Sequence, residues 1–104
     1  MEFVESTVFT RRIATLLSDE EYQELQAVLT RSPRLGDVIP GTGGLRKIRW
    51  RSVGRGKSGG VRVIYEVWAE HTLHMVFVYG KSVQDNLTAE QLRAIRERIH
   101  GGEL

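Results

Sequence analysis

The residues of this chain that are best suited to chemistry are seven basic side chains between Val38 and Tyr65, a stretch that contains no acidic residue. They are Arg46, Lys47, Arg49, Arg51, Arg55, Lys57 and Arg62. The formal net charge of the whole chain is only +2, so the remainder of the molecule is acidic. A basic block on an acidic remainder predicts a local binding site for a polyanion rather than a coat for DNA.

The spacing of the cations favours a phosphodiester as the anion. Side chains two residues apart on a strand share a face, so Lys47 and Arg49 should project together. Arg62 should begin the next strand, Lys57 lies in the glycine-rich connection before it, and Lys81 follows a third strand. Converging cations could stabilise the extra negative charge of a pentacoordinate phosphorus transition state. Crowded cations also favour the neutral amine of a lysine, which could then act as a base.

Composition alone, however, favours a simpler alternative, a solvated basic face that binds nucleic acid without chemistry. Arg46, Arg51 and Arg55 are expected to add RNA contacts. Strand alternation places Arg51 on the same face as Lys47 and Arg49, and Arg46 on the other face. Two tyrosines near the block, Tyr65 and Tyr79, could stack on an RNA base. Strand alternation favours a place in the core for both rings.

Several other kinds of site are not expected. The chain has no cysteine, which excludes disulfides, thiolate zinc sites and a cysteine nucleophile. Residues 54–59 match the GxGxxG pattern, but a strand rather than a helix should follow them, so no dinucleotide site is predicted. Two nearby histidines without a pair of acids make a poor metal site. His71, His74 and His100 are therefore expected to face solvent or cap a helix, and no metal or cofactor is predicted.

Local patterns indicate the elements that must position the basic residues. The strands are predicted over 2–7, 45–51, 61–68 and 72–79, and the helices over 9–17, from Ser18 to Pro33, and over 88–100. Capping boxes at Ser18–Glu21 and Thr88–Gln91 start the second and third helices. Residues 36–44 contain four glycines and a proline and are predicted to form a loop or turn.

These elements predict an α+β fold in the order β-α-α-β-β-β-α. A small, mostly antiparallel sheet should carry the helices, and residues 1–104 should form a single domain. In the first long strand Ile48 and Trp50 should turn to the core, while the two later strands are apolar enough to be covered on both faces. No run of apolar residues approaches the roughly 20 needed to cross a bilayer, and the N-terminus lacks the basic start of a secretory signal. We expect a cytoplasmic protein without a membrane partner.

Several segments in this order resemble the HigB branch of the RelE toxin superfamily, and the likeness spans nearly the whole chain. The segments are Phe3–Thr7, Leu17–Tyr22, Gly41–Arg49, Gly56–Tyr65, Tyr79–Lys81 and Asp85–Thr88. The resemblance implies a RelE-like, microbial-ribonuclease-like fold and a toxin of a type II toxin–antitoxin pair. It also implies an endoribonuclease that enters the ribosomal A site and cleaves mRNA without a metal. In that reaction the RNA 2′-hydroxyl attacks the adjacent phosphorus and expels the 5′-oxygen.

The same resemblance implies the partners. They are mRNA on the ribosome, a cognate antitoxin protein that neutralises the toxin, and operator DNA bound only by the toxin–antitoxin complex.

The resemblance also assigns roles to individual residues. The family's basic pair on the second strand corresponds to Lys47 and Arg49, and its arginine at the start of the third strand corresponds to Arg62. Lys47 or Lys57 would act as the base, while Arg49 and Arg62 would stabilise the phosphorane. The chain departs from the family pattern after Gly80, where an arginine and a tyrosine are missing. Lys81 is expected to cover part of the leaving-group role, and Tyr65 or Tyr79 part of the base stacking.

Two alternatives to the ribonuclease remain open. The ParE branch uses the same fold to poison gyrase without cleaving RNA, although the basic triad Lys47, Arg49 and Arg62 favours the ribonuclease. The second alternative is a non-catalytic RNA-binding module, which would bind RNA in a salt-sensitive manner without cleaving it.

Overall fold

A computed structural model describes residues 1–51, 60–80 and 87–102 of the chain. The elements are β1 (Glu2–Glu5), α1 (Thr7–Leu16), α2 (Asp19–Arg31), β2 (Asp37–Val38), β3 (Arg46–Trp50), β4 (Val61–Ala69), β5 (Thr72–Gly80) and α3 (Ala89–His100). The strands form one sheet in the order β1-β5-β4-β3-β2. β1 runs parallel to β5, and the other neighbouring strands are antiparallel. The predicted α+β architecture is thus confirmed.

One strand was not predicted. Residues 36–44 were expected to form only a loop, whereas Asp37 and Val38 pair with Lys47 and Arg46 as β2. The element order is therefore β-α-α-β-β-β-β-α. A segment of two residues is too short to show strand alternation, so no sequence pattern predicts β2. The strand forms because these two residues pair with the free edge of β3.

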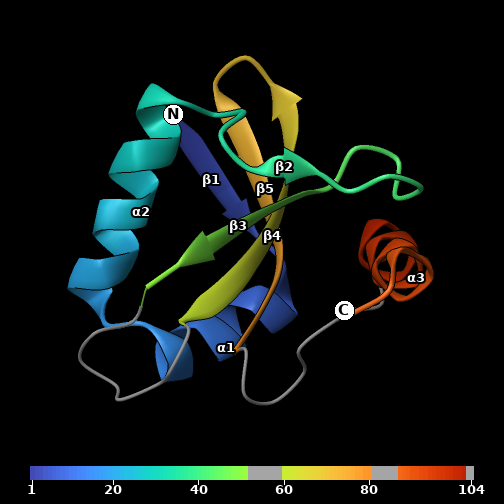
Figure 1. Cartoon of the computed structure of the whole chain (residues 1–104), viewed down its shortest axis with the longest axis horizontal. Coiled ribbons are helices and arrows are strands. Elements are labelled where there is room, and N and C mark those ends of the chain that lie inside the picture. The colour runs from blue at the N-terminus through green and yellow to red at the C-terminus, as the bar shows by residue number, and fades with distance from the viewer. Residues whose placement is uncertain (52–59, 81–86, 103–104) are drawn as a thin grey trace.

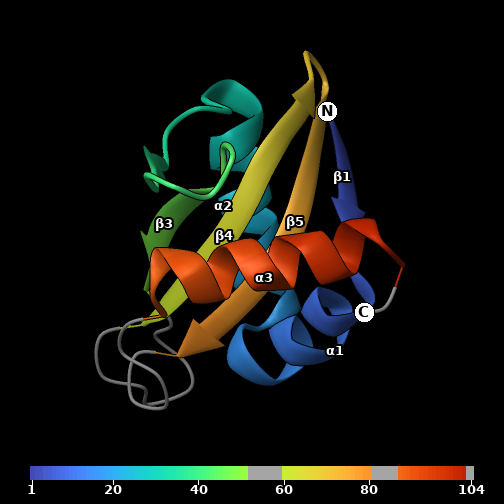
Figure 2. The same ribbon diagram turned by 90° about the vertical axis from the view of Figure 1, so that its right-hand side faces the viewer.

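Helices cover both faces of the sheet, as the apolar character of β4 and β5 predicted. Figure 1 shows α2 on one side of the strands and α3 on the other, and Figure 2 shows α3 lying across the sheet. Phe9 of α1, Leu25 of α2 and Ile48 of β3 belong to one buried core. Leu92 of α3 packs with Leu45 and other buried residues in a second core on the opposite face.

The helix starts agree with the predicted capping boxes. At the start of α2 the Ser18 hydroxyl accepts from the Glu21 N–H at 3.1 Å, and the Glu21 carboxylate accepts from the Ser18 N–H at 2.8 Å. Thr88 and Gln91 make the same pair of bonds at the start of α3. These bonds satisfy N–H groups that a helix leaves unpaired, so both helices begin where the sequence predicted.

Helix α1 covers the part of β5 that β1 is too short to pair with. The pairing between β1 and β5 ends at Met75. Beyond it the Ser6 hydroxyl donates to the Val76 carbonyl at 2.8 Å, and the Arg12 Nε donates to the Val78 carbonyl at 2.7 Å. These side chains satisfy backbone groups that would otherwise be left unpaired at the strand edge. Within the described ranges, no helix has the length and apolar character to cross a bilayer.

Candidate nucleic-acid interface

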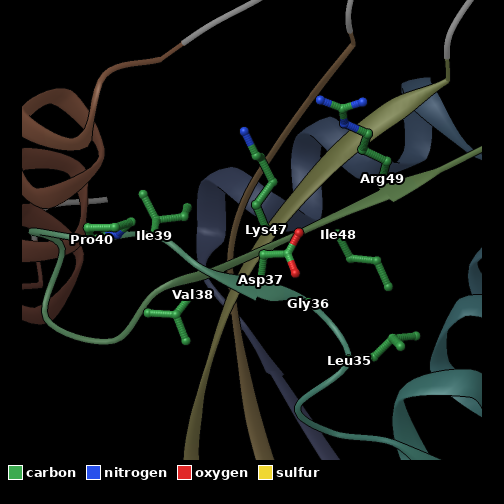
Figure 3. Close-up of a pocket in the computed structure, with 9 residues that line it drawn as sticks. All are labelled: Leu35, Gly36, Asp37, Val38, Ile39, Pro40, Lys47, Ile48 and Arg49. Atoms are coloured by element: carbon green, nitrogen blue, oxygen red, sulfur yellow. The ribbon is translucent and has the colours of Figure 1, made fainter.

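The pairing of β3 with β4 brings three of the predicted cations onto one face of the sheet. Arg49 lies directly opposite Arg62, and Lys47 lies opposite Ile64, two residues further along β4. Side chains at alternate or directly opposed positions point the same way, so Lys47, Arg49 and Arg62 share a face. Figure 3 shows Lys47 and Arg49 projecting to the same side, with Ile48 turned away from them. We call these three residues the basic patch.

The three cations lie at different depths. Arg49 is exposed and Lys47 partly exposed, whereas Arg62 retains only 7% of its surface. Tyr79 lies opposite Arg62 on β5. Burial raises the pKa of the Tyr79 hydroxyl, an effect opposed by the charges of Arg62 and Arg49 and by a hydrogen bond from the backbone of Leu87. Arg62 therefore forms the floor of the patch beside Tyr79, and Arg49 and Lys47 form its accessible rim.

A hollow of about 650 Å³ lies beside the rim of the patch. Its lining is made by Leu35, Gly36, Asp37, Val38, Ile39, Pro40, Lys47, Ile48 and Arg49 (Figure 3). The segment that contains β2 thus forms one wall, and β3 with two cations of the patch forms the other. Asp37 is the register partner of Lys47 and places a carboxylate at the edge of the patch. Asp37 lies one position before the basic block, so no pattern in the sequence pointed to it.

Tyr65 links the wall of the hollow that contains β2 to the core. Its hydroxyl accepts from the Gly36 N–H and donates to the Pro33 carbonyl, both at 2.8 Å. Burial raises the pKa of Tyr65, partly offset by the bond from Gly36 and by the charge of Arg46. A Cβ at Gly36 would lie 2.8 Å from the Tyr65 ring, so only glycine fits at this close approach.

Two of the residues expected to contact RNA do not join the patch. Arg46 lies on the other face of β3, opposite Tyr65, and its guanidinium donates to the carbonyls of Arg34 and Gly36 at 3.1 and 2.8 Å. Arg51 follows the last residue of β3 and lines a separate hollow with Trp50 and two glutamates of α2, Glu21 and Glu24. The expectation of a common face for Arg51 and the patch is wrong because the strand alternation ends at Trp50.

The two tyrosines are core residues, as strand alternation favoured. Tyr65 and Tyr79 are 0% and 1% exposed. Stacking on an RNA base requires an open ring face, and neither ring has one, so the expectation of base stacking is corrected. The remaining expected residues, Arg55, Lys57 and Lys81, lie outside the residues that the structure describes.

A further cation, Arg12, reaches the patch side of the sheet from α1. Its guanidinium carbon lies 4.8 Å from the centre of the Phe77 ring. Phe77 is opposite Ile64 on β4, and Ile64 is opposite Lys47 on β3. Phe77, Ile64 and Lys47 therefore form one row across the face of the patch, and Arg12 lies over the Phe77 end of that row. No sequence signal indicated this placement, because it depends on how α1 packs against β5.

One of the three histidines departs from expectation. His71 and His100 are exposed as expected, but His74 is 3% exposed. Its Nδ1 lies 2.7 Å from Oε2 of the buried Glu66, and Nε2 of His100 lies 2.7 Å from the same oxygen. The Arg96 Nε donates to the other carboxylate oxygen at 2.8 Å. Sequence reasoning missed this cluster, because the pairing of β4 with β5 and the packing of α3 bring its members together.

Burial alone would raise the pKa of Glu66. The hydrogen bonds from His74, Arg96 and His100, together with the charge of Arg96, outweigh that effect and hold the pKa well below its usual range. Glu66 is therefore a buried carboxylate that remains charged near neutral pH.

The chain matches a known protein family over most of its length. The family described as the RelE toxin of the RelE/RelB toxin–antitoxin system matches residues 8–100, which is most of the chain. The match covers every described helix and strand except β1 and the first residue of α1, and it includes the whole basic patch.

Proposed function

Because this chain belongs to the RelE family, the toxins of type II toxin–antitoxin systems, we propose that it arrests translation by cleaving mRNA in the ribosomal A site. The order of the sequence segments supports the HigB branch of that family. The partner that neutralises it would be a RelB-type antitoxin, and operator DNA would be bound only by the complex of the two. Its place of action is the cytoplasm, where ribosomes translate.

The observation that carries this proposal is the common face of Lys47, Arg49 and Arg62. Cleavage of RNA through its own 2′-hydroxyl creates a phosphorane with one more negative charge than the substrate. Guanidinium groups fixed beside that phosphorus stabilise this added charge, and guanidinium pairs well with two phosphate oxygens at once. Arg49 and Arg62 face each other across two strands, which suits them to hold one phosphate between them.

The proposed reaction needs a base and an acid as well as this electrostatic support. A base removes the proton of the 2′-hydroxyl, the resulting oxyanion attacks phosphorus, and the bond to the 5′-oxygen breaks as that oxygen takes a proton. The products are a 2′,3′-cyclic phosphate and a 5′-hydroxyl. We assign the base to Lys47 or Lys57 and protonation of the leaving oxygen to Lys81. Of these, only Lys47 lies within the described residues, on the rim of the patch.

The test is a map of mRNA 5′ ends shortly after induced expression, with chemistry that distinguishes 5′-hydroxyl from 5′-phosphate ends. We expect new 5′-hydroxyl ends inside translated codons, and their loss when translation is blocked. Lys47→Ala and Arg49→Ala should each remove these ends and the growth arrest. Arg31→Ala is the matched control, because Arg31 is an exposed arginine in the last turn of α2, outside the patch.

Other outcomes point to other functions. Growth arrest with DNA damage and without new mRNA ends would replace the proposal with gyrase poisoning. Salt-sensitive RNA binding without cleavage, even with ribosomes present, would indicate a binding module. Full toxicity of both patch variants would contradict the assignment of the patch as the active site.

A further inference from the structure

Three side chains that are far apart in the sequence converge on one point beneath the C-terminal helix. Glu66 comes from β4, His74 from β5 and His100 from the end of α3. Both histidine nitrogens lie 2.7 Å from the same carboxylate oxygen, and the three potential ligand atoms all lie within 4.8 Å of one another. Figure 2 shows the crossing of α3 over β4 and β5 that brings these elements together.

The cluster is separate from the basic patch. Glu66 lies four residues beyond Arg62 on β4, which places it roughly 13 Å further along the strand. The side chains of Glu66 and His74 are 5% and 4% exposed, whereas that of His100 is 36% exposed. The cluster thus has two buried members and one side that is open to solvent through His100.

The donor atoms suit a transition-metal ion of the zinc type. Two imidazole nitrogens and one carboxylate oxygen form the ligand set of open zinc sites, in which water completes the coordination. Magnesium and calcium prefer oxygen ligands and fit this set poorly. Ligands held about 2.0–2.1 Å from a tetrahedral zinc ion lie roughly 3.3 Å apart. Each 2.7 Å nitrogen–oxygen distance would therefore open by about 0.6 Å, and the separation of the two nitrogens, which lie within 4.8 Å of each other, would adjust toward the same value.

Neighbouring residues support this geometry. Arg96 binds Oε1 of Glu66 at 2.8 Å, which orients the carboxylate and leaves Oε2 facing the two histidines. Ligating carboxylates are commonly held by such a second hydrogen bond. His100 is the last residue of α3, where a small shift of the side chain meets little resistance from packing. The positive charge of Arg96 reduces the attraction for a cation, so the expected affinity is micromolar rather than nanomolar.

We propose that Glu66, His74 and His100 form a binding site for a divalent transition-metal ion, which joins the C-terminal helix to β4 and β5. The site's role is to hold α3 on the face of the sheet that also carries the patch. The rival interpretation is a cluster held by hydrogen bonds alone, and metal binding distinguishes the two.

Trp68 provides a direct probe of the site. Its ring centre lies 4.2 Å from that of His74 and 6.3 Å from that of His100. The chain has one other tryptophan, Trp50, which packs against the core on the opposite face of the sheet. In a Trp50→Phe background, Ni²⁺ or Co²⁺ bound at the cluster should quench Trp68 fluorescence. We expect saturation at one ion per chain, with a midpoint in the micromolar range.

The matched variants are His100→Ala and His71→Ala. His71 is an exposed histidine in the turn between β4 and β5, outside the cluster. In His71→Ala the metal should quench Trp68 fluorescence at the same concentrations as in the parent protein. In His100→Ala half-maximal quenching should need at least tenfold more metal. Calorimetric titration of untagged protein with Zn²⁺ should give equal affinities for the parent and His71→Ala, and a weaker affinity for His100→Ala. Saturating Zn²⁺ should also raise the melting temperature by several degrees in the parent but not in His100→Ala.

Two results would overturn the proposal. One is the absence of saturable quenching and of binding heat in the parent. The other is equal metal affinity in the parent and His100→Ala, which would place any bound ion elsewhere. All these measurements use the isolated chain without ribosomes or RNA. Failure of the cleavage proposal would therefore leave the metal-site proposal standing. Failure of the metal-site proposal would likewise leave the cleavage proposal standing.

Discussion

Arg49 and Arg62 face each other across neighbouring strands but differ in what surrounds them. Arg49 is exposed, so removing its side chain leaves the core intact, whereas Arg62 is buried at the floor of the patch. A buried arginine combines a structural and a chemical contribution that substitution cannot separate. Arg49 is therefore the better position for testing the chemistry of the patch.

We predict that Arg49→Ala lowers the rate of ribosome-dependent mRNA cleavage by about 10²-fold, because one donor to the phosphorane is lost. The free energy of unfolding should change by no more than about 0.5 kcal/mol, as for other exposed substitutions. Single-turnover cleavage on programmed ribosomes and urea denaturation measure the two effects. An unchanged cleavage rate would remove Arg49 from the active site.

Glu66 is the carboxylate to which His74, Arg96 and His100 all bond. In Glu66→Gln the amide removes the charge that neutralises Arg96 and cannot accept all three hydrogen bonds. We predict a loss of about 2 kcal/mol in the free energy of unfolding, measured by urea denaturation in the presence of a chelator. Glu70→Gln is the control, because Glu70 is an exposed glutamate in the turn that follows β4. Equal losses in the two variants would show that the buried cluster adds no stability.

At the level of elements, the wall of the hollow depends on one hydroxyl from β4. Tyr65→Phe would leave the buried Gly36 N–H without its acceptor, at a cost of about 1–3 kcal/mol in the free energy of unfolding. Hydrogen exchange should become faster at the Gly36 amide and stay unchanged at the Tyr22 amide, which bonds to Ser18 within α2. Unchanged exchange at Gly36 would show that Tyr65 does not hold this segment.

The start of β4 depends on a close approach between backbones. Gly60 has a φ of +69°, and a Cβ there would lie 2.2 Å from the Trp50 carbonyl oxygen. We predict that Gly60→Ala destabilises the fold by at least about 2 kcal/mol more than Gly44→Ala. Gly44 also has a positive φ, but a Cβ there would meet nothing within 4 Å. Thermal denaturation compares the two, and equal losses would attribute the cost to backbone strain alone.

For the whole molecule, the distribution of charge matters more than the net charge of +2. Seven cations and no anion lie between Val38 and Tyr65, while the rest of the chain is acidic. The long-range attraction for RNA should therefore be modest and concentrated at the patch.

This distribution predicts the salt dependence of RNA binding. Arg49→Ala should reduce the slope of log K against log salt concentration by about 0.7, the contribution of one phosphate contact to single-stranded RNA. Fluorescence anisotropy with a 2′-O-methyl RNA, which cannot be cleaved through its 2′ position, measures this slope. Arg31→Ala should leave it unchanged, and an unchanged slope in Arg49→Ala would place the RNA elsewhere.

The sequence by itself determined the features that depend on neighbouring residues in the chain. Strand alternation put Lys47 and Arg49 on one face and Ile48 on the other. Side chains that bond to nearby backbone groups started α2 and α3 at the predicted capping boxes. These signals are local because the pleat repeats every two residues and a cap spans three, so no tertiary contact is needed to read them.

Only the tertiary structure decided how distant segments meet. The order of the strands set Arg62 against Arg49 and made β2 from two residues of a predicted loop. It also joined Glu66 to His74 and His100. Each of these contacts links residues that are 8 to 34 positions apart in the sequence. Local periodicity carries no information about such distances, because the free energy that selects them comes from burial of the whole core.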